Sequence, residues 1–372
     1  MLLPAIPASV IEFMESLPLT MNLNTFFVLS LGLALSVLFF WGFRGLPKEN
    51  WQILACIPMN KNRDEAWRGV NYTWYGFFQA TGYVLGVSLF LVLMGAASVP
   101  SSAALTMIIL ILAVCAPLSR ILAGLVEGKR FTFTVGGAVF AGLVISPWLI
   151  GAINALGGDI FSFRLPMITT LAAMAIGHIM AEGTGRLACI SFGCCYGKPL
   201  SLLPPFVRKA LGPFAMTFYG ATKKISYAHG LDGQPVVPVQ AMTAVIYTLA
   251  GITGMWFFLA EHYLPAFAVT VGTAQGWRFL SEFLRADYRG RGRISPYQFM
   301  SLLALPYAGV LLFIFPSVPP PGGTQLLAGL ASIWTPGMIL FLQALWLLIF
   351  LYTGRSRVTA AEISLHVIID RV

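Results

Sequence analysis

The sequence predicts an all-α, polytopic integral membrane protein, a helical bundle with about nine transmembrane helices. Of its 372 residues, 58% are hydrophobic and only 10% are charged, and the mean hydropathy is +0.80. Soluble globular chains are typically about 25% charged, so this chain has too few charged residues to cover a wetted surface. Its apolar runs are long and unbroken, whereas a transmembrane β-barrel requires alternating apolar and polar residues.

Nine stretches of close to 20 apolar residues predict the spans, in chain order. They lie at 25–43, 75–97, 104–124, 133–155, 166–183, 240–261, 264–283, 298–317 and 333–353. The stretch from 240 to 283 is divided in two because Glu261, His262 and Pro265 interrupt it. The longest remaining segment, 184–239, is rich in proline and predicts an irregular or interfacial cap.

Three parts follow from this order of spans. Residues 1–74 form an N-terminal segment with one extra transmembrane helix and a basic loop. Residues 75–317 form a membrane core of seven helices, and residues 318–372 hold an extra transmembrane helix and a short tail.

The formal charge of +9 is distributed unevenly between the two sides of the predicted bundle. Apart from Arg120 and Arg278, which lie within spans near this side, the basic residues lie in the loops of one side, and Arg164 is alone on the other. The positive-inside rule makes the basic side cytoplasmic. The expected partners of these residues are phospholipid headgroups, and no nucleic acid is predicted.

Ionisable side chains inside two spans are the sharpest functional signal, because such a group in hydrocarbon costs roughly 2.5–3.5 kcal/mol on insertion scales. In each span they recur at helical spacing, on one face. The residues are His178, Glu182 and Arg186 on the fifth span, and Arg278, Glu282 and Arg285 on the seventh. One interpretation is a pocket in which arginines bind an anion and a carboxylate orients them or moves a proton. The alternative is a set of structural ion pairs, or arginines that reach the interface.

A cysteine-rich turn follows Arg186, with Cys189, Cys194 and Cys195 at the spacing C-x4-C-C. Three thiols are able to ligate zinc, but neither CxxC nor HxxxH spacing is present, so no metal is assigned. Small residues in a packed turn are the simplest interpretation. A thiolate nucleophile is a third, because Arg186 and Lys198 are cations that lower a thiol pKa.

An aromatic segment, 74–79, opens the second span on the same side. Aromatic residues at this depth are typical interface anchors. Gly136 and Gly137, near the start of the fourth span, are typical of close helix packing.

Together these segments resemble the prolipoprotein diacylglyceryl transferase family, in order and spacing, over about 75–317. The stretch Trp74-Tyr75-Gly76 is similar to the family's WYG, and Val135-Gly136-Gly137 falls where the family has HGG. Residues 185–197 resemble the GRxGNFxNGExxG signature, and 278–285 (RFLSEFLR) match RFxxEFFR. Residues 238–240 and 295–298 resemble the PxQ and SxxQ segments.

The resemblance implies a bacterial inner-membrane enzyme that moves the diacylglyceryl group of phosphatidylglycerol to the lipobox cysteine thiol of a prolipoprotein. It places Arg186 and Arg278 on the lipid phosphate, with Glu282 fixing Arg278. Tyr75 would line the entrance, and Gly136, Gly137, Gly197, Arg285 and Cys194 fall in its substrate-binding segments. Neither a metal nor an organic cofactor is implied. His178 and Glu182 are the candidate bases.

Three polar positions of the family differ here: its histidine is Val135, its asparagine Cys189 and its glutamate Cys194. The lipid-phosphate half of the site is therefore expected to be retained and the acceptor half altered. The resemblance also puts the signature outside the cell, in conflict with the positive-inside rule. The alternatives are a related enzyme with a non-lipoprotein acceptor, protein or small molecule, and a non-catalytic phospholipid-binding or transport protein. An ion-coupled carrier is the third.

Overall fold

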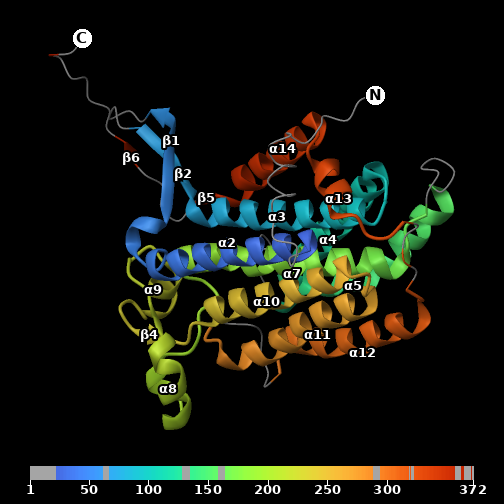
Figure 1. Ribbon diagram of the computed structural model, residues 1–372. Helices are drawn as coiled ribbons and strands as arrows, with labels where there is room; N and C mark the ends of the chain where they lie inside the picture. Colours follow the sequence, from blue (N-terminus) through green and yellow to red (C-terminus); the bar gives the residue numbers. More distant parts are fainter. Residues whose placement is uncertain are drawn as a thin grey trace.

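The computed structural model describes residues 22–61, 67–127, 135–157, 164–287, 294–317, 319, 322–356, 362–363 and 370. Within them, nine helices have 18 residues or more (Figure 1). These are α2 (Leu23–Gly45), α3 (Trp74–Ala96), α4 (Ser101–Glu127), α5 (Val135–Leu156), α7 (Met167–Phe192), α10 (Val239–Leu259), α11 (Tyr263–Ser281), α12 (Pro296–Ile314) and α14 (Pro336–Thr353). The predicted all-α membrane bundle is confirmed. The division into three parts stays a prediction, and its first 21 residues lie outside the described ones.

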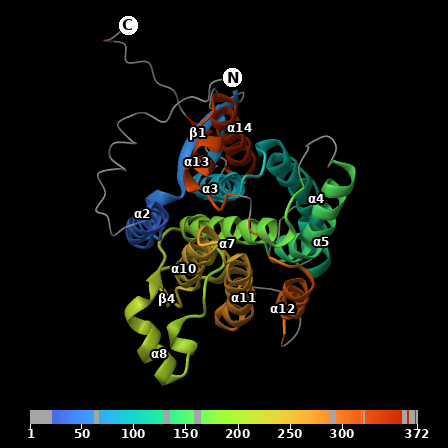
Figure 2. The same cartoon turned by 45° about the vertical axis from the view of Figure 1, so that its right-hand side comes forward.

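Seven of the nine helices are long and apolar enough to cross a membrane. The other two, α7 and α11, carry the charged side chains inside the bundle and lie among the apolar helices (Figure 2). Helix α7 continues nine residues past the predicted end of its span at 183, to Phe192. It stays helical through Gly183 and Gly185, neither of which has a positive φ.

Helix α7 is central, and it packs against α2, α3, α5, α10 and α11. Small residues let α3 and α7 approach closely. A Cβ atom on Gly86 of α3 would lie 2.5 Å from the carbonyl oxygen of Gly177, and one on Gly82 would lie 2.8 Å from that of Ala181. The backbones are therefore in direct contact, which fixes the position of the α7 side chains relative to α3.

The outer faces of the bundle are apolar. Leu33 of α2 is 68% exposed and Phe313 of α12 is 93% exposed, and only 6% of the most apolar stretch of α14 is buried inside the protein. Large exposed apolar side chains on long helices are expected where lipid is the solvent.

A β-hairpin stands where only a basic loop was expected. Strand β1 (Ile53–Lys61) pairs antiparallel with β2 (Trp67–Thr73), and β2 also pairs with β5 (Arg355–Ser356) and β6 (Glu362–Ile363). Pro58 is accommodated because β1 is an edge strand with an irregular register between Pro58 and Asn60. The rings of Trp51 and Trp74 lie 4.9 Å apart and hold the base of the hairpin against α3.

The predicted cap after α7 consists of short elements: η2 (Leu200–Leu202), α8 (Pro205–Leu211), η3 (Gly212–Phe214), β3 (Met216–Thr217), α9 (Lys224–His229) and β4 (Pro235–Val236). The hairpin, α8, α9 and β4 gather at one end of the bundle (Figure 1). The Lys223 ammonium is fully buried and donates to the carbonyl oxygens of Leu46, at 3.2 Å, and Ser191, at 2.7 Å. It thereby joins the C-terminal ends of α2 and α7.

Candidate functional site

Glu182 of α7 is the centre of the site. Its buried carboxylate accepts hydrogen bonds from Arg186, one turn further along α7, and from Arg278 of α11, the latter at 2.5 Å. The His178 Nε2 atom lies 3.2 Å from the same carboxylate. The predicted alignment of His178, Glu182 and Arg186 on one face of the helix is confirmed, because α7 stays regular through this stretch.

Two arginines share one carboxylate in this cluster, which leaves an excess of one positive charge. The Nε–H groups of Arg186 and Arg278 are buried and have no hydrogen-bond acceptor among the described residues. A buried donor without an acceptor costs about 1–3 kcal/mol. The cluster is therefore suited to an oxyanion that takes both the charge and the free donors.

A second cluster surrounds Arg285, just after α11. Its guanidinium donates two hydrogen bonds of 2.8 Å to Asp287 and lies 3.6 Å from Glu282. Glu282 also accepts from the hydroxyl of Ser295, at 3.4 Å. Among the described residues, two carboxylates contact the Arg285 guanidinium, and Glu282 is the one of them that lines the cavity.

The expectation that Glu282 fixes Arg278 is wrong, because Arg278 pairs with Glu182. Helix α11 ends at Ser281, and Glu282 begins the 3-10 turn η4 (Glu282–Leu284). The carboxylate that follows Arg278 by four residues is thus turned to Arg285, three residues further on.

A cavity of about 180 Å³ opens between the two clusters. The first turns of α3, α5, α10 and α12 and the last turns of α7 and α11 form its wall. Its charged and ionisable lining consists of His178, Glu182, Arg186, Arg278, Glu282 and Arg285, with the thiols of Cys189, Cys194 and Cys195. The cavity is far smaller than a phospholipid, so it has room for the polar end of one.

Nine of the eleven predicted site residues line this cavity, including Tyr75 and Gly136. Gly137 and Gly197 do not. Gly137 is buried within α5. A Cβ atom on Gly197 would lie 2.4 Å from the carbonyl oxygen of Val237, so this glycine permits close backbone packing and does not contact the cavity.

Polar lining residues on α3 and α10 were missed. Gln79 and Tyr83 follow Tyr75 at one-turn intervals on α3, and Gln240 and Tyr247 line the cavity from α10. The four-residue spacing on α3 was a signal present in the sequence. On α10, Gln240 stands in the segment 238–240 that resembles the family's PxQ, whereas Tyr247 carried no comparable signal.

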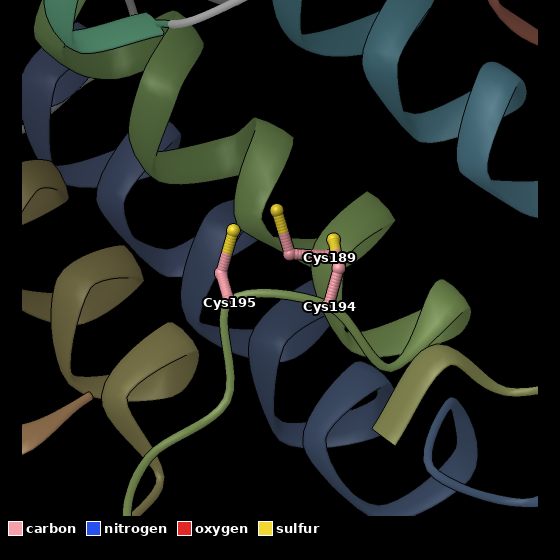
Figure 3. A group of neighbouring side chains, drawn as sticks. All are labelled: Cys189, Cys194 and Cys195. Atoms are coloured by element: carbon pink, nitrogen blue, oxygen red, sulfur yellow. The ribbon is translucent and has the colours of Figure 1, made fainter. Parts of the chain in front are cut away.

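Three thiols lie together at the α7 end of the cavity. The sulfur atoms of Cys189, Cys194 and Cys195 are all within 4.8 Å of one another, and they point to the same side (Figure 3). Within the described ranges, they are the group of His, Cys, Asp or Glu side chains with the geometry to hold a metal ion.

The sequence model of one family, prolipoprotein diacylglyceryl transferase, matches residues 66–315. The match covers the two charged clusters, the thiols and the cavity. The chain belongs to the prolipoprotein diacylglyceryl transferase family. The predicted resemblance is therefore confirmed, over almost the predicted extent.

Two relatives carry the family name. The phosphatidylglycerol–prolipoprotein diacylglyceryl transferase of Clostridium tetani is 29% identical over 136 residues, which are 36% of this chain and 48% of that protein. The phosphatidylglycerol–prolipoprotein diacylglyceryl transferase 2 of Clostridium perfringens is 28% identical over 185 residues, which are 46% of this chain and 61% of that protein. The matched part thus spans about half the length of these diacylglyceryl transferases. No solved structure matches.

Proposed function

We propose that the protein is a transferase that moves the diacylglyceryl group of an anionic, phosphatidylglycerol-like phospholipid to the lipobox cysteine thiol of a prolipoprotein. The observation that carries this proposal is the sharing of Glu182 by Arg186 and Arg278, each with a buried Nε–H free to donate. The family and the names of the two relatives support it.

The arginine pair suits the leaving group of this reaction. A phosphodiester carries one negative charge, and the glycerol phosphate that leaves carries close to two, so cations beside it stabilise the transition state more than the bound lipid. Arg186 and Arg278 are held in place by Glu182 before the substrate arrives, so little reorganisation is needed.

His178 is the better of the two candidate bases. Glu182 is held by two guanidinium groups, so protonating it would break both ion pairs. The His178 side chain is 35% exposed and borders both the cavity and Glu182. We propose that His178 accepts the proton of the acceptor thiol and that Glu182 stabilises the resulting imidazolium.

The headgroup glycerol fits the second cluster. Glu282 lines the cavity beside Arg285, and carboxylates accept hydrogen bonds from hydroxyl groups. Tyr75 and Gln79 line the α3 side, where the acyl chains would leave toward lipid. The protein is thus proposed to act as a multi-pass protein of the bacterial inner membrane.

The test uses the purified protein in liposomes of phosphatidylglycerol with a labelled headgroup glycerol. A lipobox peptide is added as acceptor, and its Cys→Ser form is the matched control. Release of glycerol phosphate together with a thioether on the cysteine peptide is expected. Release that requires a small thiol or polyol instead would assign another acceptor. Binding of the lipid without release would identify a phospholipid-binding protein.

A further inference from the structure

The three thiols are brought together by the end of α7, where the chain reverses. Gly193 adopts the left-handed region with φ 69°, and the Cys194 amide donates to the Cys189 carbonyl oxygen at 3.0 Å. Cys195 is left-handed as well, with φ 56°. This conformation is uncommon and strained for a residue other than glycine.

The turn is also held from α10. Gln240 Nε2 donates to the carbonyl oxygen of Cys194 at 2.9 Å. The turn therefore places the Cys194 and Cys195 side chains beside Cys189, on a backbone that is held at both ends. Cys195, the residue with the left-handed conformation, is one of those that present a thiol to the cavity.

The spacing of the sulfur atoms suits zinc. A Zn–S bond is about 2.3 Å long, so tetrahedral coordination places sulfur atoms about 3.8 Å apart. The three sulfur atoms lie within 4.8 Å of one another, so no pair is separated by more than about 1 Å beyond that distance. Among the described residues no fourth Cys, His, Asp or Glu joins this group. Three protein ligands with one open position are typical of catalytic zinc.

The electrostatic surroundings favour thiolates once a cation is bound. A coordinating zinc ion deprotonates thiols outright. Arg186 and Arg285 line the same cavity and would offset the remaining negative charge.

We propose that Cys189, Cys194 and Cys195 bind one Zn²⁺ ion whose open fourth position takes the acceptor thiol. This inference rests on the proposed transfer. The acceptor R–SH loses its proton on binding, and the proton passes by way of His178 to water. The sulfur electron pair forms a bond to the diacylglycerol carbon, and the bond from that carbon to the phosphate oxygen breaks. The electron pair of that bond leaves with glycerol phosphate, and the neutral thioether, a weak ligand, leaves the metal.

A direct role for the thiols as acceptors is inconsistent with turnover. Alkylation of Cys189, Cys194 or Cys195 would produce a thioether, and a thiolate bound to carbon in this way is a poor leaving group. The enzyme would then stop after one cycle. A bound metal uses the same three thiols without consuming them.

The first test measures metal content. The full chain is purified without chelator, and zinc is determined by mass spectrometry for the native chain and for Cys189→Ser, Cys194→Ser, Cys195→Ser and the triple variant. About one zinc per chain is expected for the native protein and below about one tenth for the triple variant. Cys56→Ser and Cys115→Ser are matched controls, because neither residue lines the cavity, and they should keep the metal.

The second test needs no variant and so does not depend on how the serine variants fold. Zinc is replaced by Co²⁺, and sulfur-to-cobalt charge-transfer bands are expected. Addition of the lipobox cysteine peptide should intensify or shift these bands, whereas the Cys→Ser peptide should leave them unchanged. Absence of both zinc and the cobalt bands, or full zinc content in the triple variant, overturns the proposal.

Failure of this inference is distinguishable from failure of the proposed function. Transfer at the native rate by the zinc-free triple variant would retain the transferase and overturn the metal site. Bound zinc that responds to the cysteine peptide, in a protein that never releases glycerol phosphate, would support the metal site and contradict the transferase.

Discussion

The guanidinium of Arg278 donates a hydrogen bond to the carboxylate of Glu182, 96 residues earlier in the chain. Because Arg186 donates to the same carboxylate, one acidic residue joins α7 to α11 and holds two cations at the wall of a cavity. A phosphate that enters the cavity therefore meets two arginines whose positions are already set. This arrangement is the physical basis of the proposed lipid site.

Replacement of Glu182 by glutamine should destabilise the protein. It leaves two buried guanidinium groups without their carboxylate, and breaking a buried ion pair typically costs about 3–5 kcal/mol. The thermal midpoint in detergent should fall, and glycerol phosphate should raise it more in Glu182→Gln than in the native chain, because the added anion replaces the lost charge. Asp370→Asn, at an exposed position, is the control. An unchanged midpoint would contradict the ion-pair account.

Replacement of Gly86 by alanine should separate α3 from α7. The new Cβ atom would lie 2.5 Å from the Gly177 carbonyl oxygen, a backbone atom that cannot rotate away. We expect a loss of about 1–3 kcal/mol and a lower thermal midpoint. Gly124→Ala is the matched control, because its Cβ atom would meet nothing within 4 Å. Equal behaviour of the two variants would show that the close approach is unimportant.

Lys223 should make stability rise with pH. Burial lowers its pKa to about 8, with attraction to Glu49 opposing the shift, whereas the unfolded chain has the ordinary value of 10.5. Between these values the unfolded state binds more protons than the folded state, so the free energy of unfolding increases with pH, by at most about 1.4 kcal/mol per pH unit. Below pH 8 both states are protonated and this contribution is flat.

The measurement is the thermal midpoint from pH 7 to 10.5 for the native chain, Lys223→Met and the control Lys209→Met, whose lysine is exposed on α8. Lys223→Met should lose the rise above pH 8, and Lys209→Met should keep it. The same slope in all three proteins would contradict a buried ammonium.

A lipoprotein acceptor requires the site to open on the outer side of the membrane. An alkaline phosphatase reporter fused after residue 215, in the cap that adjoins the cavity, should then be active. The matched fluorescent reporter at the same position should be dark. Fluorescence without phosphatase activity would place the cap in the cytoplasm and exclude a translocated lipobox cysteine as acceptor.

The apolar runs predicted the nine long helices, and length and hydropathy account for the seven that are apolar enough to cross a membrane. The helical spacing on α7 predicted that His178, Glu182 and Arg186 share a face. The pairing of Glu182 with Arg278 was not predictable in this way, because it depends on how α7 and α11 cross. The clustering of the three thiols was also not predictable from the sequence. The C-x4-C-C spacing brings the three sulfur atoms together only through the left-handed turn at Gly193 and Cys195.

Release of glycerol phosphate from phosphatidylglycerol tests the arginine pair most directly. The native chain, Arg186→Ala, Arg278→Ala and the control Arg208→Ala, whose arginine is exposed on α8, are compared in liposomes with a labelled lipid phosphate. We expect Arg208→Ala to match the native chain and the two site variants to be about 100-fold slower or more, as for loss of a transition-state donor. Native turnover by both site variants would contradict the account.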